Sequence, residues 1–176
     1  MNNPVLLENL RCIPDFPKKG INFRDVTTLY KNPECMKIMV DETYELYKEK
    51  GITKIVGIES RGFVMAAALA TKLGAGVVLA RKPGKLPATV IKESFSKEYG
   101  VDTVEMHIDS IDENDVVLIH DDLLATGGTA KATLKLVNHF HPKKVYMNFI
   151  IEITDEGLHG RDSLEKDVEV TTLMVI

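Results

Sequence analysis

The order of apolar segments along the chain is the feature that most limits its possible folds. Short aliphatic runs of the length of buried strands alternate with segments in which apolar residues recur every three or four positions. Strands are predicted at 54–58, 76–80, 115–119 and 144–151, and the helices between them at 62–73 and 128–140. This alternation predicts an α/β fold, with a mostly parallel central sheet flanked by helices on both faces.

Three further segments complete this organisation. A helix is predicted at 33–48, where apolar residues recur at helical spacing before Gly51. Residues 11–30 are rich in proline and glycine and are expected to be an extended, turn-rich entry segment. Residues 82–102 form a connection too long for a simple turn, so we expect a flexible, functional loop there.

Composition narrows the class of protein. A length of 176 residues predicts a single domain, 1–176, and 22 basic against 26 acidic residues give a formal charge of −4. This balance argues against a broad nucleic-acid surface. The apolar runs are far shorter than the roughly 20 residues of a membrane-spanning helix. Cys12 and Cys35 lack the spacing of a metal motif. We therefore expect a cytoplasmic protein that binds neither nucleic acid nor membranes.

Polar and charged residues follow three of the predicted strands. They are Glu59 to Gly62 after the first strand, Arg81 to Lys85 after the second, and Asp121 to Thr129 after the third. In open parallel sheets, ligands bind in the crevice beyond the carboxyl ends of the strands. We therefore expect the three sets to face one crevice.

The third set leads directly into a helix. Thr126-Gly127-Gly128-Thr129 offers free backbone amides, two hydroxyls and the positive end of a helix dipole, which together favour a phosphate. Glycine allows the backbone to approach the ligand closely. The spacing is neither that of a Walker A loop nor that of a GxGxxG dinucleotide fingerprint.

Charged residues beside this loop suggest the rest of the ligand. Asp121 and Asp122 can accept hydrogen bonds from vicinal hydroxyls or bind a hydrated metal, although acidic residues are also common at helix starts without a ligand. The cations of the first two sets, taken singly, are typical of solvated surface, but together they suit a diphosphate. Those cations are Arg61, Arg81, Lys82 and Lys85. The combination predicts a sugar that carries both a phosphate and a diphosphate.

The segment Val116–Thr129 resembles the phosphoribosyl diphosphate (PRPP) motif of the type I phosphoribosyltransferases. The similarity extends over nearly the full chain, and four further blocks resemble the branch of the family that acts on adenine. These blocks are 16–25, 59–63, 81–87 and 93–100. The resemblance implies a purine salvage transferase that joins adenine to PRPP and releases AMP and diphosphate. It also implies a homodimer, a small N-terminal hood at 1–30 and a catalytic loop at 82–102.

The resemblance also implies a role for individual residues. The ribose 5-phosphate would be held by Ala125, Thr126, Gly127, Gly128 and Thr129, and the ribose hydroxyls by Asp121 and Asp122. The diphosphate and its Mg²⁺ would be held by Ser60, Arg61, Arg81, Lys82 and Lys85. Mg²⁺ would be bound mainly through PRPP, without a tight site made by protein alone. The peptide bond between Glu59 and Ser60 is often cis in this family.

The adenine ring would contact the N-terminal segment and the PRPP motif, through Asn22, Phe23, Arg24 and Leu123. Glu98 would act as the general acid and base of the reaction, with Tyr99 beside it and Arg61 as a second catalytic group. A different purine base, or a regulator that binds DNA or RNA through the same fold, remains an alternative from the sequence.

Some positions depart from the family pattern. His120 stands where an aliphatic residue is usual, and we expect a core histidine whose ring is hydrogen-bonded. Phe95 and Lys97 replace Tyr and Leu in the loop, and Asn22 replaces an aliphatic residue. If Asn22 acts through its backbone, that exchange has little effect.

Overall fold

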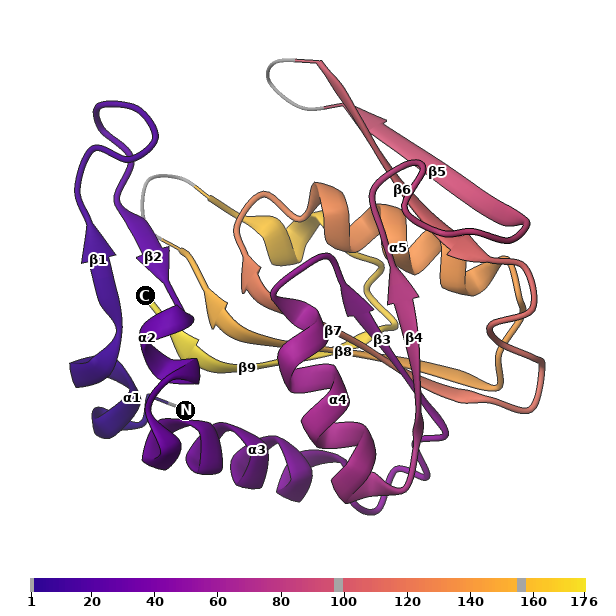
Figure 1. Ribbon diagram of the computed structural model, residues 1–176, viewed down its shortest axis with the longest axis horizontal. Coiled ribbons are helices and arrows are strands. Elements are labelled where there is room, and N and C mark those ends of the chain that lie inside the picture. Colours follow the sequence, from indigo (N-terminus) through magenta and orange to yellow (C-terminus); the bar gives the residue numbers. More distant parts are fainter. Residues whose placement is uncertain (1, 97–99, 155–157) are drawn as a thin grey trace.

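A five-stranded parallel sheet forms the centre of the computed structural model, which describes residues 2–96, 100–154 and 158–176 (Figure 1). Its order is β4-β3-β7-β8-β9, and each neighbouring pair is parallel. The strands are β3 (Lys54–Ile58), β4 (Gly76–Ala80), β7 (Val116–Leu124), β8 (Lys144–Glu152) and β9 (Glu169–Val175). After β3 the chain forms the edge strand β4. It then returns to the other side of β3, where β7, β8 and β9 are added in turn, so the direction of the connections changes between β3 and β7. This change of direction marks the expected ligand site of an open α/β sheet.

Helices cover both faces of the sheet, as the sequence predicted. On one face α3 (Pro33–Tyr47) and α4 (Gly62–Leu73) bury an apolar cluster, together with α1 (Pro4–Asn9) and α2 (Thr27–Tyr30). On the other face α5 (Gly128–Asn138) packs with a separate hairpin over a second cluster. Strands enclosed in this way are apolar at nearly every position, which explains why β3 is buried from Ile55 to Ile58.

The start of α3 illustrates how local sequence sets the helix boundaries. The Asn32 side chain accepts hydrogen bonds from the backbone N–H groups of Glu34 and Cys35, and Pro33 occupies the first turn, where it sacrifices no helical hydrogen bond. Cys35, Met39, Thr43 and Tyr47 then follow at intervals of four and are all buried. Among the described residues, none of the helices combines the length and apolar character needed to cross a lipid bilayer.

Two antiparallel hairpins stand apart from the central sheet. The first lies within the predicted entry segment 11–30, whereas the second begins in the predicted loop 82–102 and continues beyond it to His107. Residues 11–30 contain β1 (Arg11–Ile13) paired with β2 (Phe23–Asp25), and β5 (Val90–Ser96) pairs with β6 (Val101–His107). The second hairpin gains its stability by packing: Ile91 and Phe95 lie against the core on the α5 face. The sequence also did not predict β9 or the 3₁₀ turn η1 (Gly160–Ser163).

The third predicted strand is longer than expected. It was predicted at 115–119, but β7 continues to Leu124 because its pairing with β8 continues through Asp121↔Phe149 and Leu124↔Glu152. Asp121 and Asp122 therefore lie within a strand, where polar residues had suggested a loop. The following helix ends at Asn138, slightly before the predicted 140.

A row of buried and partly buried polar side chains crosses the sheet beneath the helices α3 and α4. His120, Asn148 and Thr171 are register neighbours on β7, β8 and β9. The Nδ1 atom of His120 lies 2.9 Å from Oδ1 of Asn148, whose amide donates to Thr171 Oγ1 at 2.9 Å. The Tyr47 hydroxyl completes the row at 2.6 Å from Thr171 Oγ1. His120 is thus a core histidine bonded through one ring nitrogen, while Nε2 has no hydrogen-bond partner among the described residues.

This histidine should make folding stability depend on pH. Its complete burial lowers the pKa of His120 to about 4, although the bond to Asn148 opposes the shift. Below pH 6.5 the unfolded chain takes up a proton that the folded protein binds only near pH 4, so stability falls over this interval by about 3 kcal/mol. We expect urea unfolding between pH 7 and pH 4.5 to show this loss in the wild type and a shallower slope in His120→Val.

The exposed His139 provides the matched control, since His139→Gln should keep the wild-type slope. An unchanged slope in His120→Val would show that this ring is not the group responsible.

Candidate active site

Residues from all three strand ends line one cavity at the point where the connections change direction. The cavity has a volume of about 210 Å³. Its strand-end residues include Glu59, Arg81, Lys82, Asp121 and Thr129, and β6 closes one side. Each of the three sets therefore contributes at least one residue to a common crevice, but Ser60, Arg61 and Lys85 are not among its lining residues.

The loop between β7 and α5 forms a second, adjoining cavity of about 110 Å³. It is lined by Asp121 and by the continuous segment from Leu123 to Ala130. Gly127 adopts a φ of +80°, a conformation that L side chains rarely accept, and the first turn of α5 has no side-chain cap among the described residues. The amides at this helix start thus remain available to bind an anion.

The two acidic residues at the end of β7 lie close together and are both poorly hydrated. Oδ1 of Asp121 accepts a hydrogen bond from the backbone N–H of Asp122 at 2.9 Å, and Asp122 Oδ2 lies 3.9 Å from Arg61 Nε. Burial and then repulsion from Asp122 raise the pKa of Asp121 well above its ordinary value. Burial also raises the pKa of Asp122, while Arg61 opposes this shift. A ligand that brings hydroxyl donors or a cation would relieve this repulsion.

Arg61 connects the acidic pair to the N-terminal hairpin. Its backbone carbonyl accepts a hydrogen bond from the Tyr30 hydroxyl at 3.1 Å, and its guanidinium carbon lies 5.4 Å from the centre of the Phe23 ring. The preceding Glu59–Ser60 peptide bond is cis, as the resemblance implied, and Ser60 is exposed at the turn before α4. Tyr30 was not among the predicted site residues, because nothing local in the sequence links it to Arg61.

Arg81 is held by the protein itself, in contrast to a freely exposed cation. Its Nε donates to Glu59 Oε2 at 3.1 Å and its Nη1 donates to the carbonyl of Lys85 at 3.0 Å. Glu59 also accepts the backbone N–H of Lys82 at 2.8 Å. Burial opposes ionisation, but these donors lower the pKa of Glu59. The turn from Arg81 to Lys85 is thus anchored, while the side chains of Lys82 and Lys85 are exposed at the rim.

A third pocket, of about 140 Å³, lies between the N-terminal hairpin and the loop that connects β7 to α5. It brings together the residues proposed for the adenine ring: Asn22, Phe23, Arg24 and Leu123. Its remaining lining residues are mostly aliphatic: Ile21, Ala125, Ile153 and Leu158. Ile153 and Leu158 were not predicted, since they follow β8 in a stretch that carries no recognisable motif. Leu123 and Ala125 line both this pocket and the loop cavity, so the two ligand-sized spaces are contiguous.

Two predicted residues cannot be placed in this geometry. Glu98 and Tyr99 lie outside the described residues, as does Lys97. Within the described part of the chain, no group of three or more His, Cys, Asp or Glu side chains could hold a metal ion.

Comparison with known proteins agrees with the fold and the site. Residues 25–172 match the phosphoribosyl transferase domain family. The chain is 60% identical over 176 residues to adenine phosphoribosyltransferase of Phocaeicola vulgatus and 57% identical to that of Bacteroides thetaiotaomicron, with at least 99% of each chain covered.

Solved structures show the same relationship. Adenine phosphoribosyltransferase from Rhodothermus marinus has a TM-score of 0.91 and 47% identity, covering 98% of this chain and 97% of that one. The enzyme from Giardia lamblia, complexed with 9-deazaadenine, has a TM-score of 0.92 and 38% identity, covering 100% and 98%. The chain therefore belongs to the phosphoribosyltransferase family. Within that family it belongs with the adenine phosphoribosyltransferases.

The electrostatic coupling of the acidic pair can be tested without substrate. Replacing Asp122 with Asn removes the negative charge that disfavours ionisation of its neighbour, so the pKa of Asp121 should fall. We expect the side-chain carboxyl ¹³C resonance of Asp121 to titrate at lower pH in Asp122→Asn than in the wild type. A midpoint that stays in place or rises would contradict the proposed repulsion.

Proposed function

We propose that this chain transfers the 5-phosphoribosyl group of PRPP to adenine and releases AMP and diphosphate. The observation that carries the proposal is the junction of three pockets at the change of direction between β3 and β7. A mostly aliphatic pocket, a loop of free amides and a charged crevice adjoin one another. These three surroundings suit a purine ring, a 5-phosphate and a diphosphate, respectively.

Adenine would occupy the pocket between the N-terminal hairpin and Leu123. Phe23 and Leu123 provide apolar contact for the ring, whereas Asn22 and Arg24 would contact its edge mainly through backbone groups. Residues 1–30 would thus serve as a hood for base recognition. The adenine analogue 9-deazaadenine named with the similar Giardia lamblia enzyme supports this choice of base.

The sugar phosphate would bind to the loop that follows β7. The residues from Ala125 to Thr129 would hold the 5-phosphate through backbone amides and hydroxyls, with help from the dipole of α5. Asp121 and Asp122 would accept hydrogen bonds from the ribose hydroxyls. Hydroxyl donors would reduce the repulsion between these two carboxylates, and this supports their assignment to the ribose.

The diphosphate would lie in the crevice lined by the first two strand ends. Ser60, Arg61, Lys82 and Lys85 would contact it, and Arg81 would act from its fixed position on Glu59. Mg²⁺ would enter with PRPP and be held mainly through it, and Asp121 and Asp122 could support it from the protein side. When bound, Mg²⁺ neutralises charge that accumulates on the leaving diphosphate. The arginines and lysines would contribute in the same direction through a preorganised positive potential.

Proton transfer would be carried out by the loop at 82–102. As one nitrogen of the purine imidazole bonds to the anomeric carbon, the bond to diphosphate breaks and its electrons leave with the diphosphate. Glu98 would accept the proton released by the imidazole, with Tyr99 beside it. Closure of the loop would exclude water, which could otherwise capture the cationic sugar.

The proposal includes a homodimer in the cytoplasm. Val64 on α4 and Val77 and Leu79 on β4 are each about two-fifths exposed, and such apolar surface on adjoining elements suits contact with a second copy. Both cysteines are free thiols, which agrees with a reducing compartment.

A direct assay tests the function. We expect AMP and diphosphate to form from adenine and PRPP in the presence of Mg²⁺, and no comparable turnover with hypoxanthine, guanine or xanthine. Preference for another base would redefine the substrate, and absence of turnover with every base would overturn the enzymatic proposal.

The catalytic assignment of Glu98 has its own test. Glu98→Gln cannot accept the proton, so kcat should fall by roughly 10²- to 10⁴-fold while the affinity for PRPP, measured by calorimetry with Mg²⁺, remains unchanged. Glu113→Gln, an exposed glutamate outside the site, serves as the control. Wild-type turnover in Glu98→Gln would remove this residue from the mechanism.

A further inference from the structure

The turn η1 packs directly against residues 125–127 of the loop between β7 and α5, called the phosphate loop below. A Cβ atom on Gly160 would lie 2.3 Å from the carbonyl oxygen of Ala125 and 3.0 Å from the backbone nitrogen of Gly127. Conversely, a Cβ atom on Gly127 would lie 2.5 Å from the carbonyl oxygen of Gly160 and 2.1 Å from Ser163 Oγ. Three of these four contacts are shorter than real Cβ atoms accept, so the loop and the turn constrain each other's positions directly.

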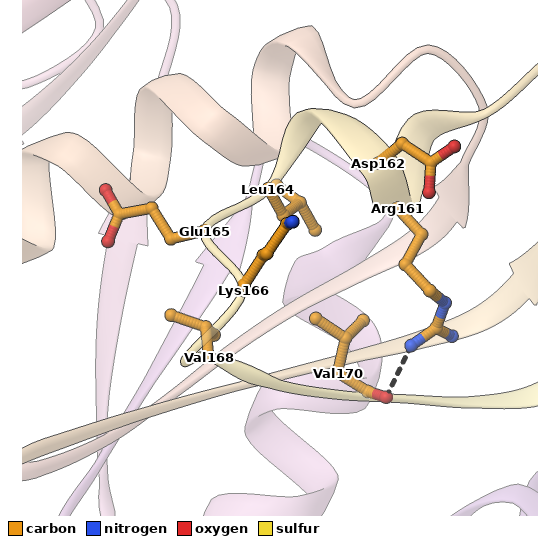
Figure 2. Close-up of a pocket in the computed structure, with 7 residues that line it drawn as sticks. All are labelled: Arg161, Asp162, Leu164, Glu165, Lys166, Val168 and Val170. Carbon is orange, nitrogen blue, oxygen red and sulfur yellow. Dashed lines mark hydrogen bonds between the residues drawn. The ribbon is translucent and has the colours of Figure 1, made fainter.

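Arg161 ties this turn to the central sheet. Its Nε donates to Glu152 Oε1 at 2.8 Å, and its Nη1 donates to the carbonyl of Val170 at 2.7 Å, the bond drawn in Figure 2. Glu152 is the last residue of β8 and is only 7% exposed, and Val170 belongs to β9. One guanidinium therefore joins η1 to two strands through charge-assisted and backbone hydrogen bonds.

Glu152 is held in its charged form opposite Arg161. The hydrogen bond from Arg161 lowers the pKa of Glu152 despite burial, and Thr172 Oγ1 donates to Glu152 Oε2 at 3.4 Å. On the other side of the turn, Leu164 is buried in the apolar cluster beneath α5. Figure 2 shows Arg161 directed from η1 toward β9, away from the phosphate loop. Its guanidinium is thus engaged with the sheet and acts on the loop through the turn that contains Gly160 and Ser163.

We propose that Arg161 is a positioning residue for the 5-phosphate of PRPP. By fixing η1 on β8 and β9, it holds Gly160 against Ala125 and Gly127 and keeps the loop amides directed at the phosphate. A loop that must be ordered by its ligand binds more weakly than one that is already ordered. This inference rests on the proposed function, and it assigns to Arg161 no contact with substrate.

The test separates binding of the two ends of PRPP. Inhibition constants against PRPP are measured for ribose 5-phosphate and for diphosphate with Mg²⁺, in the wild type and in Arg161→Met. Inhibition by ribose 5-phosphate should weaken on the order of tenfold, because the ligand must then order the loop to which it binds. Inhibition by diphosphate, and kcat at saturating PRPP, should stay within about twofold of the wild type, a change of less than 0.5 kcal/mol.

Two further variants make the result specific. Arg161→Lys keeps the charge beside Glu152 but cannot also reach Val170, so it should weaken ribose 5-phosphate inhibition less than Arg161→Met. If Arg161→Met fails to fold, ribose 5-phosphate inhibition is compared between Arg161→Lys and the wild type only. Lys37→Met breaks an exposed ion pair within α3, 2.5 Å between Lys37 Nζ and Asp41 Oδ2, and should leave both inhibition constants unchanged.

The outcomes distinguish this inference from the function on which it rests. A wild-type protein that does not convert PRPP and adenine would overturn the proposed function itself. In an active wild-type background, equal weakening of both inhibitors, or a loss of kcat with unchanged ribose 5-phosphate inhibition, would overturn the role of Arg161. Unchanged inhibition in a folded Arg161→Lys and Arg161→Met would do the same.

Discussion

The shape of the small-residue loop between β7 and α5, whose backbone amides we propose to bind a phosphate, is the constraint on which the rest of this structure depends. A loop of small residues such as Ala125, Thr126 and Gly127 has no large side chain with which to fix its own shape. Its shape must therefore come from neighbouring elements. The helix α5 continues from it, the Phe95 ring from β5 would lie within 3.0 Å of a Cβ on Gly128, and η1 presses on it from the other side. The helix that continues from the loop and two segments that are distant in sequence, β5 and η1, thus determine the shape of the proposed anion site.

Charge around the crevice is balanced more closely than its cations alone suggest. Arg81 is paired with Glu59, and Arg61 lies near Asp122, so two positive groups are partly neutralised before any ligand binds. This balance is compatible with the net acidity of the chain and keeps the empty crevice from carrying a large unpaired charge. Fixed partners also orient the guanidinium groups, which lessens the reorganisation needed when a diphosphate arrives.

Much of the fold could be predicted because buried parallel strands and their helices have strong local patterns. The bounds of β3, α4 and β4 agree with the predicted 54–58, 62–73 and 76–80. The continuation of β7 through Asp121 could not be predicted, since polar residues mimic a loop and only pairing with β8 shows otherwise. In the same way, the residue types at the strand ends indicated the ligand class. The contacts of Tyr30 with Arg61 and of Arg161 with Glu152 depend on tertiary packing and leave no local pattern.

The contact between Gly160 and the phosphate loop also has a consequence for biosynthesis. A ribosome completes α5 and the loop before it adds η1 and β9, and domains fold as their residues emerge. A nascent chain that ends before Gly160 carries every residue that would touch the phosphate but lacks the support that shapes their amides. Competence to bind PRPP would therefore arise late in synthesis, when the carboxyl-terminal strand joins the sheet beside β8. A chain that is still being made would not withdraw PRPP from the cell.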